Sequence, residues 1–234
     1  MQEEENEFFY KIVKISNETQ RVKSFELFPL DKKIFVPKAG MFIKIHYKDE
    51  LGEFERSYSL ASPPNWEKIE LLIEMVNGRL TSKLEKAKVG DVLKISGPYG
   101  LGYEEGKKSL AIAGGVGVAP FIGIIRHIKE KGLRDNFILF YSARNKEDII
   151  KKELFKELPK NIKVIITLTR ISEEEQWEGE RGRINKDMIK KYVDDVEERI
   201  CYISGGLEMV KNFESILLEL GVKKEKIRYD VWGA

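Results

Sequence analysis

The stretch Gly114-Gly115-Val116-Gly117-Val118-Ala119-Pro120 decides the fold of the second half of this 234-residue chain. It follows a short apolar run, residues 109–113, and precedes residues 121–131, where apolar side chains recur with the period of a helix. Glycines let the backbone approach a pyrophosphate, and the free N–H groups at a helix N-terminus attract one. Pro120 replaces the third glycine of the usual fingerprint, and proline is compatible with the first helical position. The stretch therefore predicts a dinucleotide-binding turn between a strand and a helix.

The rest of the second half alternates between short apolar runs and segments of helical period. The expected strands are residues 109–113, 137–141, 162–168, 200–204 and 226–231, and the expected helices are residues 121–131, 146–158, 185–192 and 207–220. Gly132 is expected to end the first of these helices. Strands that alternate with helices predict a parallel sheet in a doubly wound α/β domain.

The first half has a different pattern, with short strands at close spacing and turn residues between them. The expected strands are residues 8–15, 21–28, 41–47, 54–60, 69–76 and 92–96. This pattern predicts an antiparallel barrel or sandwich. Gly97-Pro98-Tyr99-Gly100 is expected to be the turn that closes this half, with a linker over residues 101–108. We therefore expect one domain over residues 1–105 and a second over residues 106–234.

The tetrapeptide Arg56-Ser57-Tyr58-Ser59 stands at the end of an expected strand, just before a proline-rich turn. Side chains alternate along a strand, so Arg56 and Tyr58 should share one face while the two serines share the other. A planar guanidinium suits a diphosphate, and an aromatic ring suits another ring. Taken alone, the tetrapeptide is better explained as a half-buried strand with an exposed arginine.

A second candidate anion site follows the fifth expected strand. Gly78 precedes Thr81 and Ser82, which could cap a short helix that runs to Lys86. A glycine followed by hydroxyl residues at a helix start leaves backbone N–H groups free for an anion, and Arg79 adds a cation. An ordinary turn with a capped helix is the alternative.

In this order, the motifs resemble those of the ferredoxin–NADP reductase family. Arg56-x-Tyr58-Ser59 resembles its first flavin motif, Gly78-x-x-Thr81-x-x-Leu84 its second, and Gly115-x-Gly117-x-x-Pro120 its NAD(P) loop. The resemblance extends from about Phe9 to Trp232. It implies an N-terminal antiparallel Greek-key β-barrel that binds FAD and a C-terminal Rossmann-like α/β domain with a parallel sheet that binds NADP(H) or NAD(H).

The resemblance also implies site residues. In the family, the arginine grips the flavin pyrophosphate, the tyrosine packs on the isoalloxazine ring, and the serine lies near flavin N5. The implied flavin-binding residues are Arg56, Ser57, Tyr58, Ser59, Ile73, Glu74, Val76, Gly78, Arg79, Leu80, Thr81 and Ser82. The implied NAD(P)-binding residues are Gly115, Val116, Gly117, Ala119, Pro120, Ser142, Arg144, Thr169, Arg170, Gly205, Gly206 and Met209. The implied catalytic residues, which position hydride transfer between nicotinamide C4 and flavin N5, are Ser59, Ser204 and Trp232.

Two features of the second half bear on chemistry and cofactor choice. Ser204 stands where the family has a cysteine near the nicotinamide, and Cys201 is expected on the opposite strand face as a buried apolar residue. Arg144 and Arg170 end two expected strands and could meet a 2′-phosphate, which favours NADP over NAD. Exposed arginines at strand ends are the alternative reading of that pair.

The composition excludes several classes of protein. The 41 basic and 39 acidic residues nearly cancel, and no basic run has interleaved aromatics, which argues against nucleic-acid binding. The lone cysteine excludes an internal disulfide framework and a four-cysteine iron–sulfur cluster, and with two histidines it makes no convincing metal site. The sequence has neither a signal-peptide pattern nor a stretch long enough to span a membrane, so we expect a cytoplasmic protein.

The leading hypothesis is an FAD-dependent oxidoreductase that takes hydride from NAD(P)H and passes electrons to a separate carrier protein such as ferredoxin or flavodoxin. A reductase of free flavins is the nearest alternative, because it shares the fold and the length. A non-catalytic flavin-binding redox module is the third, and Ser204 is its only support.

Overall fold

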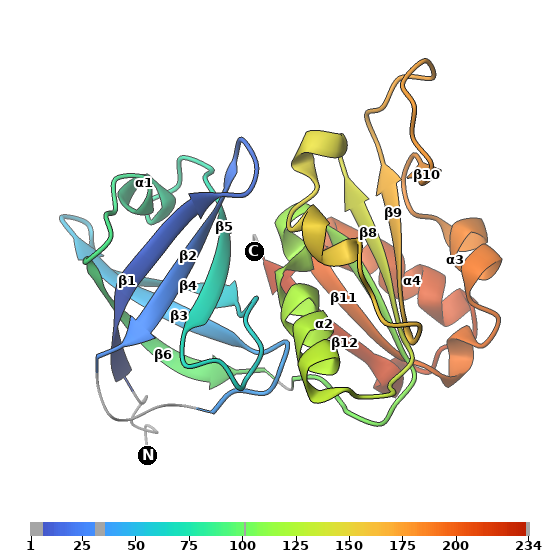
Figure 1. Ribbon diagram of the computed structural model, residues 1–234, viewed down its shortest axis with the longest axis horizontal. Coiled ribbons are helices and arrows are strands. Elements are labelled where there is room, and N and C mark those ends of the chain that lie inside the picture. The colour runs from blue at the N-terminus through green and yellow to red at the C-terminus, as the bar shows by residue number, and fades with distance from the viewer. Residues whose placement is uncertain (1–6, 31–35, 101, 233–234) are drawn as a thin grey trace. The chain divides into compact units, whose positions relative to one another are not determined.

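The computed structural model describes residues 7–30, 36–100 and 102–232, which form two compact units (Figure 1). The first unit contains the residues up to Tyr103 together with Ala119–His127, and the second contains Glu104–Val118 and the residues from Ile128 onward. An antiparallel sheet forms the first unit and a parallel sheet the second, which confirms the predicted fold class.

Six strands form the sheet of the first unit, in the order β4-β3-β6-β1-β2-β5. They are β1 (Glu7–Asn17), β2 (Val22–Pro29), β3 (Phe42–Asp49), β4 (Gly52–Ser59), β5 (Ile69–Glu74) and β6 (Val92–Tyr99), and the short helix α1 (Thr81–Leu84) follows β5. Because β6 lies between β3 and β1, the order is that of a Greek key rather than a meander. The two edge strands meet at a bridge between Leu60 and Leu71, which closes the sheet into a barrel.

The barrel core follows from the alternation of side chains along its strands. In β1, Phe8, Tyr10 and Ile12 are at most 6% exposed, whereas the residues between them face outward. Side chains from the other strands complete this core; among them are Phe25, Leu27, Ile43, Ile45, Leu71 and Ile95. Full burial of each such side chain is worth about 1.5–3 kcal/mol, so the core holds the strand edges in fixed positions.

The parallel sheet of the second unit has the order β10-β9-β8-β7-β11-β12. Its strands are β7 (Ser109–Gly114), β8 (Phe137–Ala143), β9 (Ile162–Leu168), β10 (Glu180–Arg181), β11 (Ile200–Gly206) and β12 (Ile227–Trp232). The longer helices of this half of the chain are α2 (Ala119–Lys131), α3 (Lys186–Tyr192) and α4 (Leu207–Glu219). The strand order reverses at β7, which pairs with β8 on one side and β11 on the other. Ligands bind beside the carboxyl ends of strands at such a reversal.

Local signals explain where the helices begin and end. Pro120 lies in the first turn of α2, and Gly132 ends that helix in the left-handed region with φ +62°, as predicted. Asn185 precedes α3, and its side-chain oxygen accepts a hydrogen bond from Met188 N at 2.8 Å.

Two sequence-based predictions, one of a helix and one of a turn, are wrong. Residues 146–158 form only two 3₁₀ turns, Lys146–Asp148 and Lys152–Phe155, instead of one helix. Lys151 between them is left-handed, and Ile150 N donates to the Tyr141 hydroxyl at 3.1 Å, so the backbone is bound elsewhere. Gly97-Pro98-Tyr99 continues β6 instead of forming a turn.

No described helix combines the length and the apolar character needed to cross a membrane. The described residues also contain no cluster of three or more His, Cys, Asp or Glu side chains suited to a metal ion.

Candidate functional site

The first candidate site lies on β4, an edge strand of the barrel. β4 pairs with β3 along its length, and within the described chain it approaches the opposite edge only near Leu60. β4 is therefore an edge strand, and within the described chain no second strand pairs with it over Arg56–Tyr58. Backbone N–H and C=O groups on such an edge can hydrogen-bond a planar ligand.

The strand register confirms which side chains of the tetrapeptide share a face. Arg56 lies opposite Ile45 and Tyr58 opposite Ile43, so both belong to the face that packs on the barrel core. Ser57 and Ser59 project from the other face, opposite Lys44 and Phe42. Tyr58 is half-buried against the core, and this burial raises its pKa to about 12, against the opposing effect of Arg56. Its phenol therefore stays neutral and presents an aromatic face rather than a charge.

Two arginines approach a single aromatic ring on this strand. The Cζ atom of Arg79 lies 4.0 Å from the centre of the Phe54 ring, and the Cζ atom of Arg56 lies 5.7 Å from the same point. Two guanidinium groups around one ring offer two cations for the two phosphates of a dinucleotide. The residues present thus fit the diphosphate of FAD.

The second flavin motif folds differently from the prediction. Leu80, not Thr81 or Ser82, precedes the helix, which ends at Leu84 rather than at Lys86. The Thr81 hydroxyl accepts a hydrogen bond from Gly78 N at 2.9 Å, so it closes the turn before the helix instead of capping it. Thr81 is buried while Ser82 is exposed, which leaves Ser82 the accessible hydroxyl of the pair.

The neighbouring candidates divide into core and surface positions. Ile73 and Leu80 are buried in the barrel core, so they can offer a ligand only their backbone. Glu74 pairs with Arg21 at 3.6 Å, and Val76 is exposed.

The second candidate site is the glycine-rich turn after β7. Gly115 has φ +54°, a conformation that side chains disfavour. A Cβ atom on Gly117 would lie 2.5 Å from the carbonyl oxygen of Ser204, because the turn packs directly on the end of β11. Residues 115–118 form a 3₁₀ turn that leads into α2, and Val116 belongs to it. Ala119 and Pro120 then start the helix, whose free N–H groups suit a pyrophosphate.

Met209 explains the glycines at the ends of two adjacent strands. A Cβ atom on Gly114 would lie 2.8 Å from its sulfur atom, and one on Gly205 would lie 2.6 Å away. The thioether of α4 therefore fills the space over β7 and β11. Gly206 precedes α4 and has open space around it.

Ser204 lies on β11 beside the glycine turn and is buried. Its Oγ donates a hydrogen bond to Asp230 Oδ2 on β12 at 3.0 Å. Cys201 is buried in the sheet core, and burial raises the pKa of its thiol to about 12, which keeps it protonated and inert. Trp232 ends β12 opposite Gly206, and its side chain is not among the described groups.

The two strand-end arginines lie in neighbouring chain segments. Arg170 N donates to Arg144 O at 2.8 Å, and Thr169 N donates to Ala143 O at 3.0 Å, so the pairing of β8 with β9 continues past both strands. Arg144 and Arg170 are exposed, and Ser142 is half-buried at the end of β8. This places the four predicted ribose-side residues together at one corner of the sheet.

No local pattern in the sequence predicts two other features of these sites. Phe54 is predicted only as the start of a strand, yet both arginines approach its ring. The sequence marks Asp49 only as a turn residue, yet its carboxylate binds Arg79.

Comparison with known proteins bears on both sites. The family described as Oxidoreductase FAD-binding domain matches residues 9–103, and the Oxidoreductase NAD-binding domain matches residues 111–215. Sulfhydrogenase 2 subunit gamma of Pyrococcus furiosus is 30% identical over 93% of this chain and 80% of its own length.

Two other proteins are similar over different extents. The ferredoxin–NAD(P)(+) reductase component of the naphthalene 1,2-dioxygenase system of Pseudomonas putida is 28% identical over 77% of this chain, which spans 56% of that relative. The flavohem-like FAD/NAD-binding domain of nitric oxide dioxygenase from Vibrio cholerae has the same fold, with a TM-score of 0.84 and 21% identity. That match covers 97% of this chain and 99% of the other.

Proposed function

Because the chain belongs to the ferredoxin–NADP reductase-like family of FAD- and NAD(P)-binding oxidoreductases, we propose that this NAD(P)H-dependent flavoprotein reductase delivers its electrons to a separate carrier protein, ferredoxin or flavodoxin. Bound FAD would supply the acceptor for a hydride from the nicotinamide and could pass the electrons on one or two at a time. The protein supplies binding, orientation and the exclusion of water around the reacting groups.

In this proposal, the open edge of β4 holds the flavin. Arg56 and Arg79 bind the diphosphate, and Ser82 adds an exposed hydroxyl close to Arg79 in the chain. Tyr58 packs its neutral ring on the isoalloxazine, and Ser59 hydrogen-bonds near N5. The pair of guanidinium groups around Phe54 is the observation that carries the flavin assignment.

The glycine turn and α2 hold the pyrophosphate of the nicotinamide cofactor. Gly117 brings this backbone against Ser204, so a nucleotide bound on the turn passes next to the Ser204 hydroxyl. Asp230 accepts the hydrogen bond from that hydroxyl, and this fixes the direction in which the Ser204 lone pairs point. Ser204 thus orients the nicotinamide without providing a thiol.

The corner formed by Ser142, Arg144, Thr169 and Arg170 favours NADPH as the donor. Two exposed guanidinium groups, held by paired backbones, complement a 2′-phosphate, whereas a site for NAD usually has an acid that binds the 2′-hydroxyl.

The choice of a carrier protein as acceptor draws support from the relatives. The Pseudomonas putida protein is named as a ferredoxin reductase component, and the Pyrococcus furiosus protein is named as a subunit of a sulfhydrogenase. Both names describe one component of a system that has further proteins. Because two arginines would bind the flavin diphosphate in this proposal, FAD is expected to stay bound rather than exchange as a substrate.

The test is an anaerobic titration of the purified protein with NADPH and then NADH, followed by addition of ferredoxin, flavodoxin or free FMN. We expect a flavin spectrum that bleaches faster with NADPH and is reoxidised by a carrier protein. Preferential reduction of free FMN by a colourless protein would favour the free-flavin reductase instead.

A further inference from the structure

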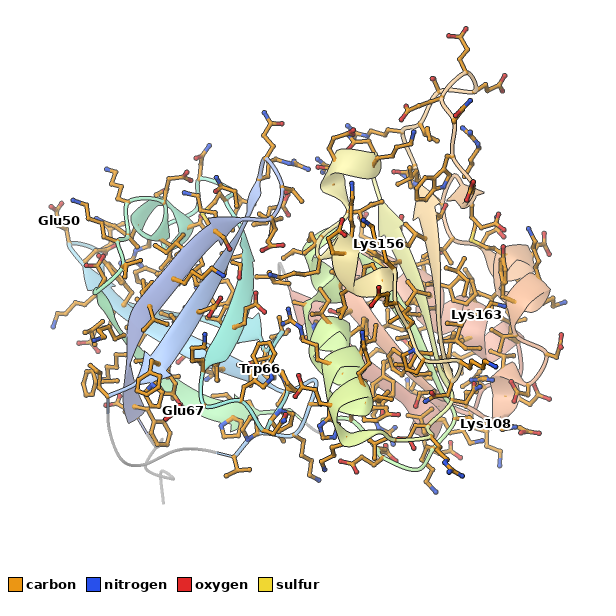
Figure 2. All side chains as sticks on the ribbon, viewed as in Figure 1. Glu50, Trp66, Glu67, Lys108, Lys156 and Lys163 are labelled. Atoms are coloured by element: carbon orange, nitrogen blue, oxygen red, sulfur yellow. The ribbon has the colours of Figure 1, made fainter. Side chains whose placement is uncertain are left out.

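The hairpin that joins β3 to β4 positions an acidic residue next to the flavin strand. Asp49 pairs with Gly52, and the loop between them contains only Glu50 and Leu51. Leu51 N donates to Asp49 Oδ1 at 2.8 Å, and Gly52 has φ +99°, which suits glycine in a tight turn. Figure 2 labels Glu50 at the tip of this hairpin. The turn therefore fixes the Asp49 carboxylate rather than leaving it mobile.

That carboxylate holds Arg79, which is 30 residues later in the chain. Arg79 Nε donates to Asp49 Oδ2 at 2.7 Å, and Nη2 donates to Asp49 Oδ1 and to the Gly52 carbonyl, the latter at 2.9 Å. This is a bidentate pair with a third contact from the same hairpin. The Asp49 side chain is 15% exposed and that of Arg79 is 29% exposed, so the ion pair is partly buried at the surface of the barrel.

Phe54 fixes the plane of the same guanidinium. The Arg79 Cζ atom lies 4.0 Å from the centre of the ring, close enough for a cation–π contact. A guanidinium has five N–H donors, and the two contacts to Asp49 and the one to Gly52 use those of Nε and Nη2. Among the described residues, no group accepts a hydrogen bond from Nη1, so this edge of Arg79 is the one left for a ligand.

We propose that Asp49 is a positioning residue that locks Arg79 against Phe54, so that its Nη1 edge binds a phosphate of the flavin nucleotide beside Arg56. The proposal rests on the flavin placement given under Proposed function. Arginine in a flexible position loses side-chain entropy when it binds, and a locked arginine has lost that entropy in advance. Asp49 therefore increases affinity for flavins that carry phosphate and leaves the contacts to the ring unchanged.

The charge of Asp49 opposes this gain, but its carboxylate contacts the Nε–Nη2 edge, so the guanidinium lies between it and a phosphate at Nη1. The hydrogen bond from Arg79 lowers the pKa of Asp49 to about 2, so the carboxylate is ionised wherever the enzyme works. The lock is thus permanent rather than pH-gated.

The experiment compares FAD with riboflavin, which has the same ring and no phosphate, by measuring dissociation constants for the protein stripped of flavin. Asp49→Ala should weaken FAD roughly tenfold, the loss expected when one charge-assisted contact is disordered, and should leave riboflavin unchanged. In the double variant with Arg79→Ala, FAD should bind no more weakly than with Arg79→Ala alone, because Asp49 acts through Arg79.

Glu53→Ala is the matched control, since Glu53 lies in the same hairpin and pairs with Lys48 on the surface at 3.2 Å. It should change neither affinity. The inference fails if Asp49→Ala leaves FAD binding unchanged or tightens it, or if riboflavin weakens as much as FAD. It also fails if the two substitutions are additive. If Arg56→Ala also leaves FAD binding unchanged, the flavin placement itself is wrong. If Arg56→Ala weakens FAD binding while Asp49→Ala does not, the flavin placement stands and only the role proposed for Asp49 is wrong.

Discussion

The two candidate sites are built in opposite ways. Around β4 the candidate site consists of side chains, chiefly Arg56, Arg79 and Tyr58, and both arginines contact other side chains. In the parallel sheet the candidate site consists largely of glycines. A Cβ atom on Gly114 or Gly205 would collide with Met209, and one on Gly117 would collide with Ser204. The first site depends on charge and orientation, and the second depends on space. Substitutions should therefore damage them in different ways.

The largest effect should follow from adding one carbon atom to the second site. In Gly117→Ala, the new Cβ would lie 2.5 Å from the Ser204 carbonyl oxygen, so the turn must move away from β11. We expect the rate of flavin reduction by NADPH to fall on the order of 100-fold, while FAD binding stays unchanged. Stopped-flow absorbance measures the rate.

Gly206→Ala is the control for Gly117→Ala, because a Cβ there meets no atom within 4 Å and φ is −65°. Gly206→Ala should lower the rate of flavin reduction by NADPH much less than Gly117→Ala does. Equal losses in the two variants would mean that space at Gly117 is not what the turn requires.

Removing charge from the first site should have the next largest effect. Arg56→Ala is expected to weaken the binding of FAD by about 30-fold, as for the loss of a hydrogen bond to a charged group. The binding of riboflavin, which has no phosphate, should hardly change. Fluorescence titration gives both constants. Lys14→Ala serves as the control, since Lys14 pairs with Glu26 on the barrel surface. An equal loss for FAD and riboflavin would contradict a phosphate contact.

A smaller effect, on the apparent KM for NADPH, is expected at the arginine side chains of the second site. Arg144→Ala should raise the apparent KM for NADPH about tenfold and leave that for NADH unchanged, because only NADPH has the 2′-phosphate. Arg134→Ala removes another exposed arginine of the same half and should change neither. A matching rise for both donors would show that Arg144 does not read the 2′-phosphate.

The smallest effect should be a loss of folding stability at high pH, and we expect it in both units. Burial raises the pKa of Tyr10 and Tyr58 in the barrel, and of Tyr202 in the α/β unit, to about 12. An unfolded tyrosine ionises near pH 10, so stability that is complete below pH 10 is lost as the pH rises towards 12. Melting temperatures between pH 8 and 11 should decline above pH 10, and less steeply in Tyr10→Phe. A slope that Tyr10→Phe does not change would exclude that residue as a source.

The sequence predicted what local patterns control. The period of the apolar residues located both sheets, and Gly132 marked the end of α2, because these signals depend on neighbours along the chain. The helix predicted over residues 146–158 failed because the Tyr141 hydroxyl of the preceding strand, β8, binds its backbone at Ile150. Thr81 failed as a cap because it bonds back to Gly78.

Contacts between distant residues could not be predicted at all. Asp49 and Arg79 are 30 positions apart, and Ser204 and Asp230 are 26 apart. Each pair is brought together by the order of strands in its sheet, which no local signal encodes. The resemblance to a family supplied the individual site residues, but not the groups that hold them.

The open edge of β4 has a consequence for the behaviour of the protein without its flavin. An unpaired strand edge is a place where another chain can add a strand, and edges that aggregate are usually long and uncharged. β4 has Glu53, Glu55 and Arg56 along it, so the strand that would hold the flavin in our proposal also carries charges that discourage such pairing. Loading with flavin would cover what remains, so cofactor supply in the cell would also govern how much of this protein stays in solution.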